Sequence, residues 1–186
     1  MIEHTTNKAW FAREVALEAH GDQRYGDGPY SIHLDEVVAI LKEFGINEDQ
    51  TLATAYLHDV LEDTKLGAEA IELGFGEPIK DAVLFCTDEP GANRRERKRA
   101  TYKRANRAVV AMELNPKPII LERAIRMGIT VKLADRLANL RRSVGTDLMR
   151  MYVKERETFR LAYYTDRMSL LFPMWEEYER LMETRP

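Results

Sequence analysis

The chain has 186 residues, of which 45% are hydrophobic and 32% charged, and its formal net charge is −3 at pH 7. This length is typical of one domain with a proper core, and the small net charge does not favour a partner such as nucleic acid or an acidic membrane surface. The single cysteine, Cys86, cannot form an intramolecular disulfide, and the first residues lack the layout of a secretory signal. The apolar runs are far shorter than the roughly 20 residues of a membrane helix. We therefore expect a cytoplasmic protein.

Residues that favour helices, chiefly Ala, Leu, Glu, Arg and Met, dominate the whole chain, and no alternating run of β-branched residues predicts a convincing strand. The sequence thus predicts an all-α protein. The first helix is expected over about residues 5–20, with Gly21 at its end. Residues 21–30 contain three glycines and a proline, which predicts a turn-rich loop that leaves room for a ligand.

Ser31 is expected to cap a second helix that continues to about Phe44 and stops at Gly45. Asn47, with Gln50 three positions later, matches a capping box and predicts the start of a third helix. Further breaks are predicted at Gly74, Gly76, Pro78, Pro116 and Pro118.

A final pair of helices is expected from about residue 146 to 184. Its Met, Tyr and Trp residues occur at helical spacing, which predicts packing on the core, with a homodimer contact as the alternative. No linker or repeat marks a boundary. We therefore expect residues 1–186 to form a single multi-helix bundle, with a catalytic core over about residues 5–145.

The segment 57–64 places one imidazole and three carboxylates within six residues, among apolar neighbours. If it forms one helix, His58, Asp59, Glu62 and Asp63 project at about 0°, 100°, 40° and 140°, so all four share a face. That face should also carry apolar residues, and an isolated carboxylate there is unfavourable unless it is paired or bound to a metal.

Two other segments could complete a metal site. His33 follows the glycine-rich loop, and Asp135 lies between the small residues Ala134 and Ala138 in an apolar helix pattern. Two histidines and two aspartates form a mixed nitrogen and oxygen ligand set that suits manganese, iron or zinc and leaves positions for water. His4 and His20 have no such companions and are expected to be surface or packing residues.

These residues resemble the HD superfamily of metal-dependent phosphohydrolases, and more narrowly the hydrolase domain of the RelA/SpoT family with its small stand-alone ppGpp hydrolases. The resemblance covers about residues 5–145. The matching features are Arg24, Gly-Pro-Tyr30 before His33, Leu-His-Asp-Val-Leu-Glu-Asp-Thr64, Thr87-Asp88 ahead of Glu-Arg-Lys-Arg99, and Val-Lys-Leu-Ala-Asp-Arg-Leu-Ala-Asn139.

The resemblance implies an HD-domain fold and a manganese ion, Mn²⁺, held by His33, His58, Asp59 and Asp135. It implies that Glu62 and Asp63 position and activate the attacking water. The implied reaction removes the 3′-pyrophosphate from guanosine tetra- or pentaphosphate (ppGpp or pppGpp), which gives GDP or GTP and pyrophosphate. The implied partner is thus a guanine nucleotide.

The resemblance also implies a set of residues that contact the substrate: Arg24, Tyr25, Arg97, Lys98, Lys132 and Asn139. Arg24 would stack on the purine, and Asn139 would lie near the base. The family commonly has Lys at the position of Tyr25, so another nucleotide with a 2′- or 3′-phosphate, such as NADPH, is an alternative substrate.

The segment 94–107 contains eight basic residues and one acidic residue. A solvated helix face explains such a run most simply, and a nucleic-acid patch would need more interleaved aromatic residues than Tyr102. By resemblance, Arg97 and Lys98 would face the pyrophosphate, and Lys132 and Arg136 could act similarly. A module that senses nucleotides through this run without turnover is the non-enzymatic alternative.

Overall fold

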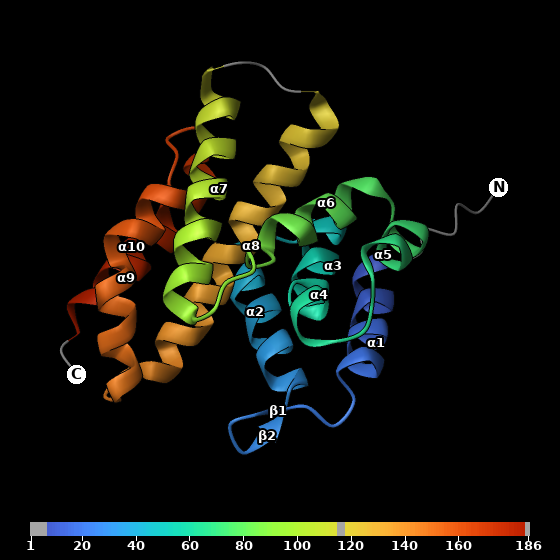
Figure 1. Cartoon of the computed structure of the whole chain (residues 1–186), viewed down its shortest axis with the longest axis horizontal. Helices are drawn as coiled ribbons and strands as arrows, with labels where there is room; N and C mark the ends of the chain where they lie inside the picture. Colours follow the sequence, from blue (N-terminus) through green and yellow to red (C-terminus); the bar gives the residue numbers. More distant parts are fainter. Residues whose placement is uncertain (1–6, 115–117, 185–186) are drawn as a thin grey trace.

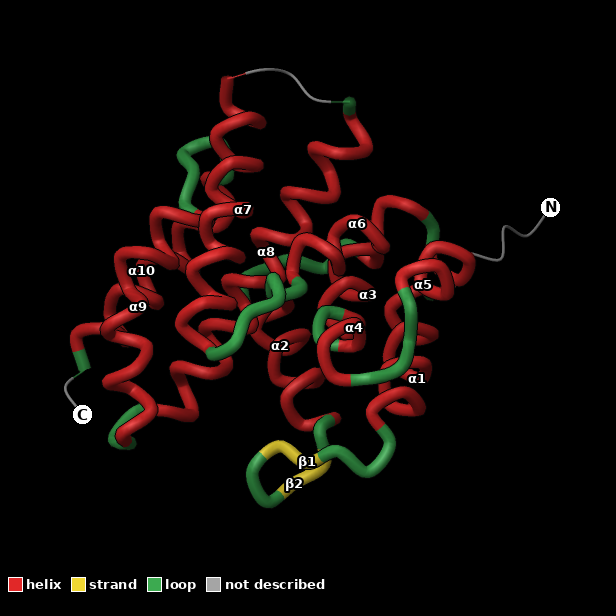
Figure 2. Tube along the Cα trace, viewed as in Figure 1, coloured by secondary structure: helices red, strands yellow, loops and turns green. Residues whose placement is uncertain are grey.

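The computed structural model describes residues 7–114 and 118–184, nearly all of which lie in helices (Figures 1 and 2). The all-α prediction is confirmed. Within the described residues, the only strands are β1 (Arg24–Tyr25) and β2 (Gly28–Pro29), which pair antiparallel in the predicted glycine-rich loop. His4 and Pro116 lie outside the described residues.

The first half of the chain folds into short and medium helices, seen on the right of Figure 1. They are α1 (Lys8–His20), α2 (Ser31–Glu43), α3 (Asp49–Leu57), α4 (Val60–Asp63), α5 (Ala68–Phe75) and α6 (Glu77–Cys86). The second half contains the two longest helices, followed by shorter ones. They are α7 (Arg94–Leu114), α8 (Ile119–Ser143), α9 (Asp147–Tyr163), the 3-10 helix η1 (Ser169–Leu171) and α10 (Phe172–Glu183).

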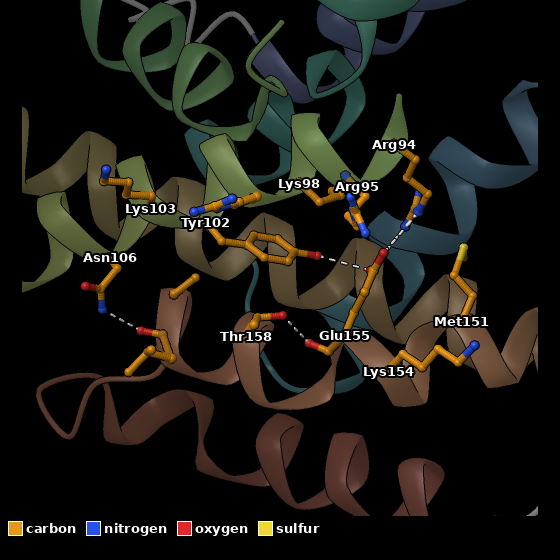
Figure 3. A pocket seen from close by; sticks show the side chains of 13 residues that line it. Arg94, Arg95, Lys98, Tyr102, Lys103, Asn106, Met151, Lys154, Glu155 and Thr158 are labelled. Atoms are coloured by element: carbon orange, nitrogen blue, oxygen red, sulfur yellow. Dashed lines mark hydrogen bonds and ion pairs between the residues drawn. The ribbon is translucent and has the colours of Figure 1, made fainter. Parts of the chain in front are cut away.

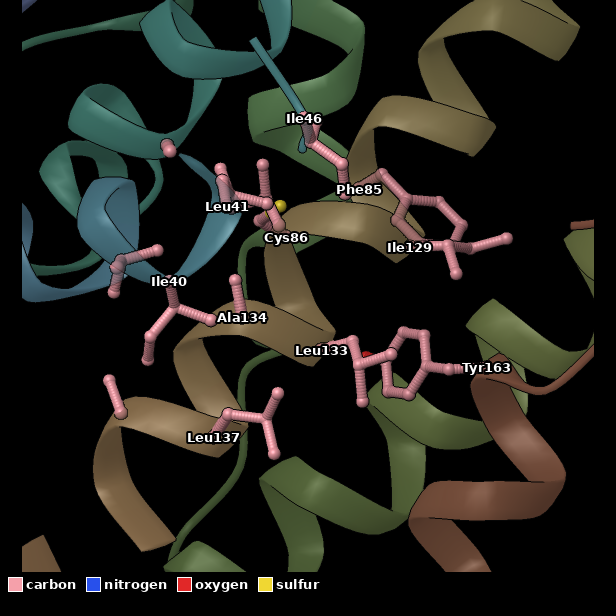
Figure 4. Close-up of a cluster of buried hydrophobic side chains, with 14 of the residues drawn as sticks. Ile40, Leu41, Ile46, Phe85, Cys86, Ile129, Leu133, Ala134, Leu137 and Tyr163 are labelled. Atoms are coloured by element: carbon pink, nitrogen blue, oxygen red, sulfur yellow. The ribbon is translucent and has the colours of Figure 1, made fainter. Parts of the chain in front are cut away.

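Helix α8 is the centre of the fold. It packs against α2, α3 and α6 on one side and against α9 and α10 on the other. A helix that is apolar around most of its circumference has to be buried, and α8 is buried over most of its length. Ile129, Leu133 and Leu137 of α8 lie in one apolar cluster with Leu41 of α2 and Phe85 of α6 (Figure 4). Residues from both halves of the chain therefore meet on this helix.

Gly128 lets α6 and α8 approach closely. A Cβ atom at this position would lie 2.4 Å from Cδ1 of Phe85, a distance that real Cβ contacts do not show. The close approach also brings Sγ of Cys86 within 3.7 Å of the Gly128 carbonyl oxygen, to which it donates. The missing side chain therefore sets the spacing between these helices two turns before Asp135.

Helix α1 ends as predicted. Gly21 follows its last residue with a φ of 52°, and its N–H donates to the Leu17 carbonyl oxygen. A positive φ of this size is unfavourable for residues with a Cβ, so glycine is the natural choice at this helix end. The helix begins at Lys8, within the predicted segment.

The predicted capping box at Asn47 and Gln50 is wrong. Helix α3 begins at Asp49, and Glu48 occupies the N-cap position. The Asp49 carboxylate instead accepts hydrogen bonds from the backbone N–H groups of Lys8 and Ala9, both at 3.0 Å. The first residue of α3 thus caps α1, while α3 itself begins without a side-chain cap.

The prediction that Ser31 caps α2 is also wrong. Tyr30 occupies the N-cap position and makes no side-chain capping bond. The end of this helix at Glu43, followed by Gly45 with a φ of 78°, agrees with the sequence prediction. The predicted break at Gly76 is confirmed, because this residue separates α5 from α6. The predicted break at Gly74 is wrong, because Gly74 lies inside α5.

The aromatic residues of the last two helices pack on the core, as predicted. Phe159, Tyr163, Trp175 and Tyr178 are all buried and form a chain of ring contacts between α9 and α10. None of the helices in residues 7–114 and 118–184 is long and apolar enough to cross a membrane.

Candidate metal centre and catalytic cavity

The segment that carries the histidine and the three acids does not form one helix. Helix α3 ends at Leu57, His58 and Asp59 form a turn, and α4 begins at Val60. Asp59 has φ −104° and ψ −5°, and its carbonyl oxygen accepts from the N–H groups of Glu62 and Asp63. Because the helical phase changes at this turn, the predicted common face for all four side chains is wrong.

The structure brings the four predicted metal ligands together from three parts of the chain. One nitrogen or oxygen atom each of His33, His58 and Asp135 lies within 4.8 Å of the other two. Asp59 is next to both imidazoles, with Oδ2 at 2.9 Å from His58 Nε2 and 3.5 Å from His33 Nε2. Oδ1 of Asp135 is 3.4 Å from His33 Nε2 and 3.9 Å from His58 Nε2.

His58 presents Nε2 to the other members of the cluster. Its Nδ1 is 2.8 Å from the Ala55 carbonyl oxygen, which only accepts, so Nδ1 carries the proton. In the neutral imidazole, Nε2 then has a lone pair, and this atom is buried without a hydrogen-bond partner. The Asp59 carboxylate oxygen 2.9 Å from Nε2 calls for a positive charge at this contact, supplied either by a proton on Nε2 or by a bound cation.

The pKa shifts within the cluster also favour a bound cation. Burial opposes the charged form of His33, but hydrogen bonds with Asp135 and Asp59 outweigh it and raise the pKa of His33 to about 10. Burial would raise the pKa of Asp135, but the ammonium of Lys132 and the two imidazoles hold this pKa well below its usual range. Two half-buried carboxylates, Asp59 and Asp135, therefore stay ionised beside two imidazoles. Such a donor set fits a divalent metal ion.

Neighbouring side chains hold both carboxylates in place. The buried hydroxyl of Tyr30 donates to Oδ2 of Asp59 at 2.5 Å. Nδ2 of Asn139 donates to Oδ1 of Asp135 at 2.6 Å, and Nζ of Lys132 donates to Oδ2 of Asp135 at 3.2 Å. Such outer partners orient metal ligands, so Lys132 and Asn139 support the cluster in addition to their predicted role in substrate binding.

A cavity of about 180 Å³ opens directly above this cluster. The side chains that line it are Tyr25, Tyr30, His33, Asp59, Glu62, Arg94, Lys98, Lys132, Asp135, Arg136, Asn139 and Tyr152. Four of the lining residues are cations, which suits an anionic ligand.

The two acids after the cluster have different surroundings. Glu62 lines the cavity, and its Oε1 accepts from the backbone N–H of Asp88 at 2.7 Å. The loss of hydration raises the pKa of Glu62, with Lys132 acting in the opposite direction, and a raised pKa suits a carboxylate that takes up a proton. Asp63 lies outside the cavity lining, exposed, and accepts from Nε2 of Gln23 at 3.0 Å.

Of the six predicted substrate contacts, Tyr25, Lys98, Lys132 and Asn139 line the cavity, whereas Arg24 and Arg97 do not. Tyr25 donates to Oδ1 of Asn139 at 3.0 Å, and Lys98 forms an ion pair of 2.8 Å with Asp88. Arg24 donates to the Asp27 carbonyl oxygen within the hairpin, and exposed Arg97 is absent from the cavity lining.

The sequence reasoning missed three lining residues, Arg94, Tyr30 and Tyr152. Arg94 lies one turn before Lys98 on α7, so helical periodicity applied to the basic run could have found it. Tyr30 belongs to the Gly-Pro-Tyr motif before His33, but its contact with Asp59 joins residues 29 positions apart, which no local pattern reveals.

The helical fold and the His-and-Asp cluster at its centre are the features of a metal-dependent hydrolase class. A family model described as an HD domain matches residues 12–161, and the chain therefore belongs to the HD-domain family.

Among curated proteins, the chain is similar to guanosine-3′,5′-bis(diphosphate) 3′-pyrophosphohydrolase MESH1 of Xenopus tropicalis, with 36% identity over 134 residues. The alignment covers 70% of this chain and 66% of that protein. The guanosine-3′,5′-bis(diphosphate) 3′-pyrophosphohydrolase of Aquifex aeolicus is 33% identical over 131 residues, which cover 70% of this chain. They cover only 17% of that protein, so the chain spans a small part of such long relatives.

A solved structure with the same fold is titled "A metazoan ortholog of SpoT hydrolyzes ppGpp and plays a role in starvation responses". It superposes with a TM-score of 0.71 and 25% sequence identity. The match covers 95% of this chain and 97% of that one, so it includes the C-terminal helices α9 and α10.

Proposed function

We propose that this protein is a manganese-dependent hydrolase that removes the 3′-pyrophosphate from ppGpp and pppGpp and releases GDP or GTP. The observation that carries the proposal is the juxtaposition of the His-and-Asp cluster with Glu62 and four cations around one cavity. The printed activities of the frog and Aquifex relatives support the choice of substrate.

His33, His58, Asp59 and Asp135 would hold the metal ion. When bound, a divalent ion neutralises charge on phosphoryl oxygens and acidifies water, which is the chemistry that an anionic phosphate ester needs. The mixed imidazole and carboxylate set suits Mn²⁺, and the same donors also accept iron or zinc.

Glu62 is the residue that takes the proton in this proposal. It lies in the cavity lining and its carboxylate is fixed by the backbone of Asp88, so it has a defined position beside the cluster. The water oxygen bonds to the phosphorus that carries the 3′ oxygen, and the bond between this phosphorus and the 3′ oxygen breaks. The water proton passes to Glu62, which returns it to the departing 3′ oxygen, so that this oxygen leaves as the nucleotide hydroxyl.

Asp63 acts one step away from the reacting atoms in this proposal. Its carboxylate accepts from Gln23, which precedes the hairpin that ends beside Tyr30. We therefore assign Asp63 to positioning the hairpin and α4, whereas Glu62 contacts the water.

The cations bind and orient the pyrophosphate group. Lys98 and Arg94 come from α7, and Lys132 and Arg136 come from α8, so the cavity has positive charge on two sides. Guanidinium groups bind phosphate oxygens in pairs, and lysine ammonium groups bind them as point charges. Burial and the charge of Lys132 lower the pKa of Lys98, and its partner Asp88 acts in the opposite direction.

One contact supports the alternative substrate. The guanidinium of Arg142 lies 4.5 Å above the ring of Tyr25, at the position where the family commonly has Lys. This pair offers a positive charge together with an aromatic surface at the cavity entrance, which also suits another 2′- or 3′-phosphorylated nucleotide such as NADPH.

The test is release of pyrophosphate from ppGpp by the Mn²⁺-loaded protein, with NADPH and phosphate release assayed in parallel. We expect turnover of ppGpp to exceed that of NADPH. No pyrophosphate from a protein shown to contain metal would overturn the proposal, and faster turnover of NADPH would select the alternative.

The variant Glu62→Gln separates an enzyme from a binding module. We expect it to lose turnover and to keep ppGpp affinity within a few-fold, with Glu69→Gln on the exposed face of α5 as the matched control. A nucleotide sensor would be indifferent to both changes. The cytoplasmic location, the homodimer and the lack of nucleic-acid binding stay predictions.

A further inference from the structure

A second and larger hollow lies between α7 and α9, on the other side of Arg94 and Lys98 from the catalytic cavity. Its volume is about 710 Å³, which is within the usual range of small-molecule sites. Apolar parts of Tyr102, Met151, Leu161 and Ala162 contribute to its walls (Figure 3). We refer to it as the α7–α9 groove.

The groove is bordered by cations. They are Arg94, Arg95, Lys98, Arg99, Lys103 and Lys154, and Glu155 is the one acidic side chain among the lining residues. Arg94 pairs with Glu155, and Lys98 pairs with Asp88. The other four cations form no ion pair with any of the described residues.

The four unpaired cations are exposed to solvent. They border a concave, largely apolar surface, which can hold the body of a ligand while its anionic group contacts the charges. A concave apolar site with a few charged groups at its border is typical of small ligands rather than of extended polymers.

We propose that the α7–α9 groove is a second binding site, for a small phosphorylated anion with an apolar or aromatic body. The body lies against the apolar walls, and the phosphate is bound by the unpaired cations. Nucleoside phosphates and phosphorylated acyl chains share this chemistry.

The groove communicates with the catalytic cavity through shared side chains. Arg94 and Lys98 line both. Glu155, in the groove wall, accepts from Arg94 and also from Arg136, which lines the catalytic cavity. An anion in the groove competes with Glu155 for Arg94, so its binding changes the affinity of the catalytic cavity for phosphate, and this effect is reciprocal.

Calorimetric titration of the full chain tests the site without depending on turnover. The probes are GDP and dodecyl phosphate, and pyrophosphate is the control that has no apolar body. We expect one of the two amphipathic probes to bind about tenfold more tightly than pyrophosphate. A GDP response that the groove variants below weaken identifies a nucleotide site in the groove, and such a response to dodecyl phosphate identifies a site for acyl phosphates.

Two variants locate the binding. Lys103→Glu with Lys154→Glu reverses two unpaired cations, and Thr158→Trp fills the groove without a change of charge. The matched control, Lys42→Glu with Arg107→Glu, changes the net charge equally at exposed residues outside the groove. We expect about tenfold weaker probe binding for both groove variants and no change for the control.

The proposal is overturned if neither amphipathic probe binds, if the groove variants bind the probe like the control, or if they weaken pyrophosphate binding as much as probe binding. Coupling is read from the KM for ppGpp, which we expect the probe to change by a larger factor in the wild type than in Thr158→Trp. If ppGpp is no substrate, the proposed function fails, whereas the calorimetric result for the groove stands on its own.

Discussion

The hydroxyl of Tyr30 offers the sharpest test of how the metal centre is held. It is buried and donates to Oδ2 of Asp59 at 2.5 Å, the same oxygen that faces both imidazoles. Burial and the charge of Asp59 raise the pKa of Tyr30 far above its usual value, so the hydroxyl keeps its proton at any working pH. Tyr30→Phe removes this donor and nothing else.

The size of the effect follows from the kind of bond. A hydrogen bond to a charged acceptor contributes about 1.5–3 kcal/mol, and each 1.4 kcal/mol is a factor of ten. Removing outer partners of metal ligands generally costs about 10- to 100-fold in metal affinity. We therefore expect Tyr30→Phe to bind Mn²⁺ about 10- to 100-fold more weakly, and to regain turnover at high Mn²⁺.

The assay is competition for Mn²⁺ against a chelator of known affinity, with thermal unfolding recorded for each protein. The matched control is Tyr178→Phe, which removes a buried hydroxyl that donates to the Arg156 carbonyl oxygen at 3.1 Å, away from the metal cluster. Equal Mn²⁺ affinities for Tyr30→Phe and the control would refute the reasoning.

Three further predictions concern stability. Glu155→Ala leaves the buried guanidinium of Arg136 without its carboxylate, so we expect chemical denaturation to show a loss of about 3–5 kcal/mol, and an unchanged midpoint would contradict this. Gly128→Ala forces its Cβ against Phe85, which should cost about 1–3 kcal/mol in the same assay, whereas no loss would mean that α6 can move. Because the folded-state pKa of His33 is raised to about 10, metal-free protein should lose stability as the pH rises from about 6.5 to 10, and a rise would reverse the sign. His33→Gln should abolish that dependence.

The predicted metal ligands could be found from the sequence because their residue types have few other uses in apolar surroundings. Asp135 between small residues has little reason to be buried without a cation, and the paired His58 and Asp59 needed partners from elsewhere. His33 came from a different segment, and the fold brings it to within 3.5 Å of Asp59. Residues that have to come together around one ion can thus be predicted from the sequence before the fold is known.

The different positions of Glu62, in the cavity lining, and Asp63, outside it, could not be predicted. They depend on the break after Leu57, where Asp59 leaves regular helix geometry and its carboxylate meets Tyr30 and the imidazoles. Helix propensity is too weak to reveal such a break, because tertiary contacts override it.

Tertiary packing also limited the prediction of substrate contacts in the basic run, residues 94–107. The sequence favoured Arg97 beside Lys98, but the phase of α7 places Arg94 in the cavity and leaves Arg97 exposed. Arg24 was expected to stack on the base, and that contact stays a prediction, since its guanidinium donates to the Asp27 carbonyl oxygen within the hairpin. The side on which a charged helix face lies depends on what packs against it, here α9.

The most direct test of the central claim is the fate of the water oxygen. Mn²⁺-loaded protein is incubated with ppGpp in water enriched in oxygen-18, and mass spectrometry of the products locates the label. Attack at the phosphorus next to the 3′ oxygen predicts one labelled oxygen in the pyrophosphate and none in GDP. Label in the 3′ hydroxyl of GDP, or no release of pyrophosphate from metal-loaded protein, would contradict the account.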